Sequence, residues 1–268
     1  MTTSEPRKPT TAAVNGPLWG AKARDWAELQ EARFRPMYEA VFDRTGLGTN
    51  TQYLDVGCGA GLAAMIASKR GAEVSGIDAA LGLLEVANER VPKGDLRHAD
   101  LESLPFGDAS FDLVTGFNSF QYAGNPVVAL SEAARVVRPA GQVVIATWGV
   151  PDGMEASAIV RSMGPLLPPP PPGAPGPFAL SDESALRTFA QAAGLRARDV
   201  FDVYLDFVFA DHDAAIRGLS ASGVAVRAAA HSGQQAVEQA HEQAIAPYLQ
   251  QDGSYRLKAS FRCLVACP

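Results

Sequence analysis

Residues 51–64 read TQYLDVGCGAGLAA, and this stretch decides the fold. A short apolar run ends at Val56 and is followed by three glycines, Gly57, Gly59 and Gly61. A glycine loop between a strand and a helix usually cradles a nucleotide, because its backbone can approach the ligand closely. The stretch therefore predicts a buried strand, a ligand-binding loop and the first turn of a helix.

The sequence after this loop continues as alternating helices and strands. Apolar patterns predict strands at residues 52–57, 72–78, 94–100, 110–117 and 141–149. Helices are expected at 60–71, 79–91 and 125–138, the last with Asn125 as N-cap and Pro126 at its first position. This alternation is typical of a parallel sheet with helices on both faces, which binds ligands beyond the carboxyl ends of its strands.

The C-terminal half predicts an antiparallel addition to the sheet. Two alternating stretches, 198–211 and 255–268, indicate strands that form a hairpin at the sheet edge. Helices are expected at 181–196, with Ser181 as N-cap, and at 213–223 and 233–250. The expected fold class is α/β: a doubly wound, mostly parallel seven-stranded sheet with helices on both faces, its last strand antiparallel, and a helical cap inserted near the C-terminus.

Composition and charge exclude several classes of protein. The chain has 268 residues, a formal net charge of -6 and 47% hydrophobic residues. An acidic chain without a basic face argues against nucleic-acid binding. The sequence has no run of about 18 apolar residues, so it predicts no membrane span, and the first residues lack the apolar core of a signal peptide. Three cysteines and four scattered histidines indicate a reducing compartment, which we expect to be the cytoplasm, and no metal site.

Asp55 narrows the choice of nucleotide. The glycines are spaced G-x-G-x-G instead of the dinucleotide pattern G-x-G-x-x-G, and Asp55 lies two residues before the first of them. An ionised carboxylate repels a pyrophosphate but attracts an amine. Asp55 therefore fits a ligand with a cationic end, although it can also bond the backbone amides of its own turn.

Two further acids follow at the ends of the next strands. Asp78 follows Gly57 by about the 20 residues at which an acid meets a ribose diol, the alternative being a helix N-cap. Asp100 and Leu101 end the third strand, where a carboxylate and a backbone N–H could pair with an adenine; a solvated loop acid is the alternative for Asp100. An amine, a ribose and an adenine together describe S-adenosylmethionine.

At this point the sequence resembles the class I S-adenosylmethionine-dependent methyltransferases of the small-molecule type. The resemblance rests on LDVGCGAG (54–61), GID (76–78), HADLESLPF (98–106), SFDLVTGFNSFQYA (110–123) and VVRPAGQVVIATWG (136–149). These motifs come in the family's order and spacing over about 100 residues. One departure is Ala140, where the family often has glycine; it affects only a turn.

The resemblance implies a role for each matching residue. Asp55, Gly57 and Gly59 would hold the methionine part of the cofactor, and Asp78 the ribose. The adenine would lie on Asp100 and Leu101, and the sulfonium beside Phe117 and Asn118. Trp26, together with Trp19, would close over the cofactor from the N-terminal helices, the alternative being ordinary core packing.

The chain is expected to consist of an N-terminal tail and a single domain. Residues 1–17 are expected to be a disordered tail and residues 18–268 one methyltransferase domain. Within it we expect N-terminal helices at 18–48, the cofactor-binding core at 49–150, a proline-rich loop at 164–180 and the helical cap at 211–250. The five prolines Pro168–Pro172 favour polyproline II, which suits a connecting loop or a docking segment.

The expected reaction is methyl transfer to a small, partly apolar acceptor, such as a secondary metabolite. Proximity and orientation would supply most of the catalysis. No catalytic residue is assigned; Gln121, Tyr122 and His231 are the weak candidates, and Gln121 and Tyr122 with Asn118 would shape the acceptor pocket. The alternatives are a cofactor-binding relative without transferase activity, a nicotinamide-dependent reductase and a polyproline-driven interaction protein. The acceptor stays unnamed, and a homodimer stays open.

Overall fold

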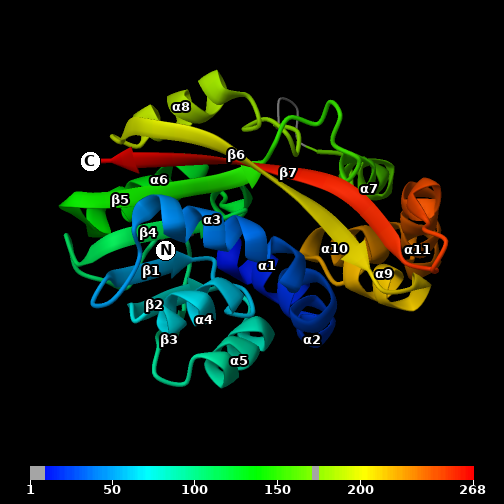
Figure 1. Ribbon diagram of the computed structural model, residues 1–268, viewed down its shortest axis with the longest axis horizontal. Helices are drawn as coiled ribbons and strands as arrows, with labels where there is room; N and C mark the ends of the chain where they lie inside the picture. The colour runs from blue at the N-terminus through cyan, green and yellow to red at the C-terminus, as the bar shows by residue number, and fades with distance from the viewer. Residues whose placement is uncertain (1–9, 171–174) are drawn as a thin grey trace, which may run out of the picture.

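A seven-stranded sheet runs through the centre of the molecule, with helices on both faces (Figure 1). The computed structural model describes residues 10–170 and 175–268. Its strands are β1 (Gln52–Val56), β2 (Glu73–Asp78), β3 (Asp95–His98), β4 (Phe111–Phe117), β5 (Val137–Trp148), β6 (Arg196–Phe209) and β7 (Tyr255–Cys267). Their order is β3-β2-β1-β4-β5-β7-β6, and β7 is antiparallel to both of its neighbours. The predicted fold class is therefore confirmed.

The helices connect and cover these strands. The α-helices are α1 (Thr11–Gly20), α2 (Ala23–Asp25), α3 (Arg35–Thr45), α4 (Leu62–Lys69), α5 (Leu81–Arg90), α6 (Pro126–Val136), α7 (Ser157–Met163), α8 (Glu183–Ala192), α9 (His212–Leu219), α10 (Gly223–Ser232) and α11 (Gln234–Ile245). Among the described residues, η1 (Trp26–Gln30) is a π-helical segment, and the short 3-10 helices are η2 (Glu31–Phe34), η3 (Phe120–Tyr122), η4 (Gly164–Leu166) and η5 (Ala246–Tyr248). As predicted, α6 begins at Pro126, and Asn125 accepts a hydrogen bond from the Val128 N–H.

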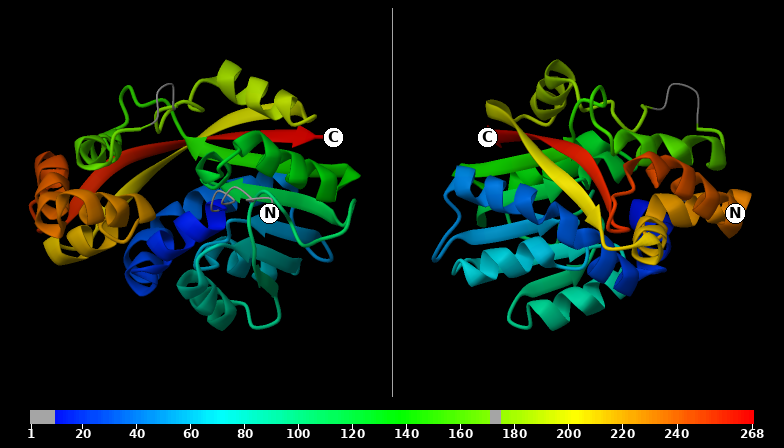
Figure 2. Two further views of the ribbon diagram at one scale, coloured as in Figure 1. Left: turned by 180° about the vertical axis from the view of Figure 1, so that it is seen from behind. Right: turned by 45° about the vertical axis from the view of Figure 1, so that its right-hand side comes forward.

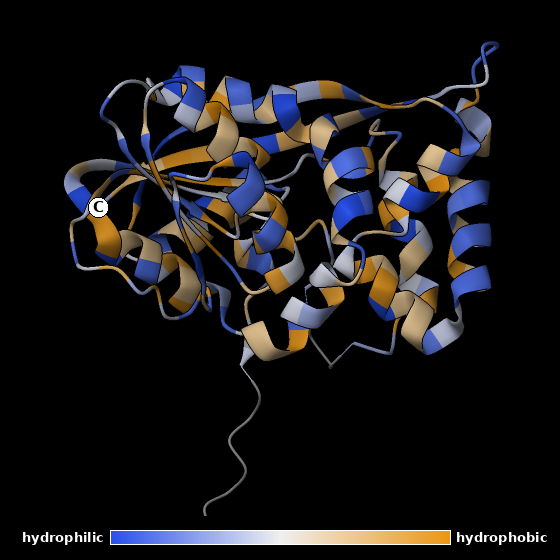
Figure 3. Ribbon diagram, turned by 90° about the horizontal axis from the view of Figure 1, so that it is seen from below, coloured by the Kyte–Doolittle hydropathy of each residue, from blue (hydrophilic) through white to orange (hydrophobic). Residues whose placement is uncertain are grey.

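Alternating side chains divide the core into two layers. On β1, Tyr53 joins the cluster on the side of α3 and α4, whereas Leu54 joins the cluster on the side of α6 and α8. Both faces are buried because parallel strands joined by helical crossovers are covered on each side. The helices carry hydrophilic and hydrophobic residues together, as elements with one buried face do (Figure 3). This packing holds the carboxyl ends of β1, β2 and β4 at one rim of the sheet.

The hairpin of β6 and β7 extends beyond this rim. Its strands pair from Arg196 with Cys267 to Phe209 with Tyr255, and α9, α10 and α11 lie between them in the chain. These helices and α7 gather at the far end of the hairpin (Figures 1 and 2). The N-terminal end of α10 reaches the N-terminal helices, because a Cβ on Gly223 would lie 2.7 Å from the Trp19 ring.

The N-terminal segment differs from the expected tail. Residues 1–9 lie outside the described residues, but Thr11–Gly20 form α1, so the prediction of disorder was wrong for residues 11–17. The Thr10 hydroxyl caps this helix, and the glycines of α1 let its backbone approach the loop after β2. A Cβ on Gly16 would overlap the Ala79 carbonyl oxygen. Long-range contacts of this kind have no local signal in the sequence.

Other differences are smaller. The N-cap of α8 is Asp182 instead of Ser181, because the Asp182 carboxylate accepts the Ala185 N–H. Pro36, which was expected to kink the N-terminal helix or to start a second one, lies in the first turn of α3, where a missing N–H costs nothing. Helix α10 was not predicted, because its small alanine-rich face carries a weak apolar pattern. Residues 171–174 of the proline-rich loop, which include the last two prolines of the run, lie outside the described residues.

Candidate functional site

The glycine loop leaves β1 at Val56 and enters α4 at Leu62. All three of its glycines have positive φ, a left-handed conformation that other residues rarely adopt. A Cβ on Gly57 would lie 2.5 Å from the Ser119 Cβ, whereas one on Gly59 would meet nothing nearer than 3.6 Å. Gly57 is therefore required by packing, whereas a Cβ on Gly59 would make only ordinary contacts, with Glu31 and the Trp26 indole.

Asp55 lies beneath this loop at the end of β1. It is 1% exposed, and its Oδ1 accepts a hydrogen bond of 3.2 Å from the Thr115 hydroxyl, which also contacts the Tyr53 phenol at 2.7 Å. The protein thus bonds Asp55 to the neighbouring strand β4. Burial raises the pKa of Asp55 to about 8, because the charged carboxylate loses its hydration, and nearby Glu31 adds to the effect.

Asp78 joins the end of β2 to the glycine loop. Its Oδ2 accepts the Gly59 N–H at 2.8 Å, and its Oδ1 accepts the Ala80 N–H at 2.8 Å. Burial raises its pKa, and these two N–H donors oppose the rise. Helix α5 begins later, at Leu81. Each carboxylate oxygen has two lone pairs, so the oxygens retain capacity to accept from ligand hydroxyls.

Helix α1 lies across the third predicted acid. The Asp100 Oδ2 accepts the Ala12 N–H at the start of α1, and its Oδ1 accepts the Glu102 N–H, both at 2.9 Å. The Asn15 side chain donates to the Tyr122 carbonyl at 2.8 Å. Asp100 is thus a bonded loop acid that anchors α1, and the structure brings Leu101 to the same turn.

The loop after β4 brings together the predicted acceptor-side residues. Asn118 has a φ of 51°, which asparagine tolerates better than most residues, and its Oδ1 accepts from the Gln121 amide at 2.9 Å. Phe117 packs edge-on against Tyr38 at 4.7 Å. Burial raises the pKa of Tyr122 to about 12, so its phenol stays protonated at neutral pH and is a poor base.

The predicted aromatic lid lies against the loop. Trp26 in η1 stacks on Phe34 at 5.9 Å, and its indole nitrogen lies 3.8 Å from where a Cβ on Gly59 would be. Trp19 contacts Trp26 at 5.1 Å and Tyr122 at 5.6 Å, both edge-on. The two tryptophans therefore connect the glycine loop with the loop after β4.

His231 lies apart from these residues. It is exposed near the end of α10, and its Nδ1 lies 3.2 Å from the Leu166 carbonyl oxygen. The other end of α10, at Gly223, is the one that meets Trp19. Eight helical residues separate the two positions, a distance of about 12 Å along the axis. The structure does not bring His231 to the glycine loop.

Glu31 and Arg90 are residues that the sequence did not single out. Glu31 is 2% exposed, and one carboxylate oxygen pairs with the Arg90 guanidinium. Burial raises the pKa of Glu31 to about 7, and Arg90 opposes the rise. The stretch from Trp26 to Phe34 mixes apolar and polar residues and holds a second acid, Glu28, so no local signal marks Glu31 as buried, and nothing in the sequence pairs it with Arg90, 59 positions away.

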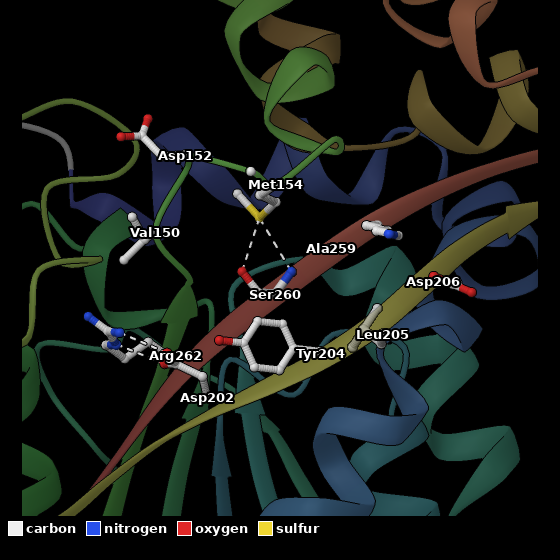
Figure 4. Close-up of a pocket in the computed structure, with 12 residues that line it drawn as sticks. Val150, Asp152, Met154, Asp202, Tyr204, Leu205, Asp206, Ala259, Ser260 and Arg262 are labelled. Atoms are coloured by element: carbon white, nitrogen blue, oxygen red, sulfur yellow. Dashed lines mark hydrogen bonds and ion pairs between the residues drawn. The ribbon is translucent and has the colours of Figure 1, made fainter.

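An open pocket lies apart from these site residues. It has a volume of about 560 Å³ and lies on the face of β6 and β7 that carries Asp202, Tyr204 and Arg262 (Figure 4). Its lining includes none of the predicted site residues, all of which the structure describes. Within residues 10–170 and 175–268, no group of three or more His, Cys, Asp or Glu could hold a metal ion, and no helix is long and apolar enough to cross a membrane.

Comparison with known proteins identifies the core. A family model described as a methyltransferase domain matches residues 54–145. The demethylmenaquinone methyltransferase of Renibacterium salmoninarum is 35% identical over 46% of this chain and 52% of its own length. The 27-O-demethylrifamycin SV methyltransferase of Amycolatopsis mediterranei is 32% identical over 55% of this chain and 60% of its own. The chain thus spans about half the length of these curated relatives.

Solved structures extend the likeness to the whole fold. The [4+2]-cyclase SpnF matches with a TM-score of 0.61 at 20% identity, covering 99% of this chain and 98% of its own. A structure described as a putative methyltransferase from Bacillus halodurans matches with a TM-score of 0.57 at 17% identity, covering 86% of this chain and 97% of its own. At these identities the likeness establishes the fold alone.

Proposed function

Because the chain belongs to the class I S-adenosylmethionine-dependent methyltransferases, we propose that it transfers the methyl group of S-adenosylmethionine to a small, partly apolar acceptor. The observation that carries this proposal is the loop at Gly57–Gly61, held between Asp55 on one strand and Asp78 on the next. Glycines in a loop allow a ligand to approach the backbone closely, and carboxylates beside the loop favour a ligand that carries a positive charge.

The charges around the loop fit this cofactor. Besides burial, the nearby Glu31 and Asp78 raise the pKa of Asp55, and Arg90 is the basic group paired with Glu31. A ligand with an ammonium and a sulfonium would offset the excess of carboxylates. The Ser119 hydroxyl, 7% exposed and without a hydrogen-bond partner among the described residues, lies beside Gly57 and would gain a polar partner.

Each part of the cofactor would then have a matching group. The methionine part would lie over Gly57 and Gly59, with Asp55 beneath. The free lone pairs of Asp78 would accept the ribose hydroxyls, and Asp100 and Leu101 would border the adenine under α1. Phe117, Asn118 and Trp26 would surround the sulfonium, where aromatic faces favour a positive charge.

Catalysis would rest mainly on positioning. Bound S-adenosylmethionine supplies a methyl group that its sulfonium already activates for in-line displacement. The chain's contribution is to hold the acceptor atom in line and to exclude water, and alignment of this kind is worth up to about 7–11 kcal/mol. Asn118, Gln121 and Tyr122 line the loop next to Trp19, so we assign the acceptor to this side. The small-molecule acceptors named for the relatives support a secondary metabolite as acceptor.

Two of the alternatives to methyl transfer concern the glycine loop itself. A nicotinamide reductase would have to place a pyrophosphate beside Asp55 and Glu31, which repel it whenever they ionise, whereas a cationic ligand stabilises their ionised forms. A relative that binds the cofactor without transferring its methyl group is the nearer alternative, because this fold also occurs in a protein described as a cyclase.

A methyl-transfer screen tests the proposal. Wild-type protein is incubated with methyl-labelled S-adenosylmethionine and pools of small metabolites, with Asp78→Ala as the matched control. We expect labelled product with the wild type and none with the variant. Tight cofactor binding without labelling of any acceptor would favour the binding-only alternative.

A further inference from the structure

Glu31 is a buried carboxylate carried by the N-terminal helices. Its Oε1 lies 3.3 Å from the Leu62 N–H at the start of α4, which donates to it, and its Oε2 pairs with Arg90. A carboxylate this deeply buried is retained only when its lone pairs are satisfied. Together with the Ala60 backbone N–H, which also stabilises the charged form of Glu31, these partners use most but not all of the roughly four acceptor positions of a carboxylate.

Arg90 fixes the position of this carboxylate. Besides Glu31, its guanidinium donates to the Ala60 carbonyl of the glycine loop and to the Ala27 carbonyl of η1, each at 2.9 Å. One side chain therefore ties α5, the loop and the N-terminal segment together. Arg90 is a positioning residue, and its guanidinium holds Glu31 against the loop.

One oxygen of Glu31, Oε1, lies close to Gly59. A Cβ on Gly59 would lie 3.6 Å from Glu31 Oε1 and 3.8 Å from the Trp26 indole nitrogen. A ligand atom in contact with the Gly59 backbone would therefore meet a carboxylate oxygen from the opposite side. Oε1 is an acceptor, so the complementary ligand group is a donor, and a cationic donor gives the strongest bond.

The ionisable groups around Glu31 also favour a cationic ligand. The ionisable groups around Glu31 are Arg90 on α5, Asp55 on β1 and Tyr38 on α3, with Asp78 beyond Asp55. Arg90 is the cation among them. The unpartnered Ser119 hydroxyl beside Gly57 independently indicates that a polar ligand group belongs in this space.

We propose that Glu31 determines specificity for the amino-acid half of the cofactor, with its Oε1 accepting a hydrogen bond from the ligand's α-ammonium over Gly59. This inference rests on the proposed function, because it presumes that the loop holds S-adenosylmethionine. It adds a residue outside the glycine motif and assigns the recognition of the ammonium to the N-terminal segment.

Two ligands separate this role from a structural one. S-adenosylhomocysteine carries the ammonium, whereas 5′-methylthioadenosine keeps the adenosine and lacks the amino-acid half. Calorimetry on the full chain compares wild type, Glu31→Gln and Glu28→Gln, the last an exposed glutamate three residues away. We expect Glu31→Gln to lower the affinity for S-adenosylhomocysteine by roughly 10- to 100-fold, which corresponds to the loss of a hydrogen bond to a charged group. The affinity for 5′-methylthioadenosine should change by no more than about twofold. Glu28→Gln should leave both unchanged.

The other outcomes overturn the inference in distinguishable ways. Equal losses for both ligands would make Glu31 a structural residue, and no loss would remove it from the site; in either case the proposed function stands. A wild type that binds neither ligand would overturn the inference together with the proposed function. Should Glu31→Gln fail to fold, Glu31→Asp is the second variant, because it keeps the charge on a side chain that is shorter by one methylene. It should again lower the affinity for S-adenosylhomocysteine but not that for 5′-methylthioadenosine.

Discussion

The carboxylate of Asp78 accepts a 2.8 Å hydrogen bond from the backbone N–H of Gly59. The acid at the end of β2 therefore holds the open glycine of the β1 loop, and the two predicted anchors form one unit. A change at Asp78 should affect the loop and the proposed ribose site together, because the same side chain would serve both.

Asp78→Ala should abolish measurable cofactor binding while the protein remains folded. The variant loses the proposed acceptors for the ribose hydroxyls and leaves the Gly59 and Ala80 N–H groups without their partner. Calorimetry with S-adenosylhomocysteine and circular dichroism check the two statements. Asp95→Ala, an exposed acid on β3, is the control and should bind normally. Tight binding by Asp78→Ala would contradict the ribose assignment.

Gly57→Ala and Gly59→Ala should fail in different ways. At Gly57 the new Cβ would meet Ser119 at 2.5 Å, so the melting temperature should fall by several degrees, at roughly 2–4 °C per kcal/mol for a chain of this size. At Gly59 the Cβ meets no protein atom nearer than 3.6 Å and enters the proposed cofactor space. Gly59→Ala should therefore lose more affinity than stability. The same loss of stability in both variants would argue against an open Gly59.

The ligand-free protein should lose stability as the pH rises. Burial raises the pKa of Glu31 to about 7 and that of Asp55 to about 8, so the folded chain keeps protons that the unfolded chain releases above about pH 4–5. The stability that these two protonated groups contribute is therefore complete below about pH 4–5, and it is lost as the pH rises through 7–8. The melting temperature should fall between pH 5 and 9, and Asp55→Asn should flatten the fall. A rise over this range would contradict these pKa shifts.

Gln121→Ala and Tyr122→Phe should impair turnover without weakening the cofactor. Both residues lie on the proposed acceptor side, and Tyr122→Phe keeps the ring that contacts Trp19. Once an acceptor is found, KM or kcat should change several-fold while the affinity for S-adenosylhomocysteine stays constant. Unchanged turnover in both variants would move the acceptor away from this loop.

The parts of the site that the sequence predicted are local. Asp55, the glycines and Asp78 follow directly from strand ends and backbone conformation, which short stretches determine. The anchoring of α1 by Asp100 and the pairing of Glu31 with Arg90 join residues 88 and 59 positions apart. Such pairs arise only when the sheet brings distant segments together, so α1 was mistaken for a tail and Glu31 was missed.

Titration of the wild-type protein with S-adenosylmethionine, and separately with NADH, tests the central claim most directly. The claim is that the loop over Asp55 and Asp78 cradles a cationic cofactor with no pyrophosphate. Calorimetry should show S-adenosylmethionine binding with micromolar affinity at one site per chain, and no heat with NADH. Binding of NADH with no binding of S-adenosylmethionine would contradict the account.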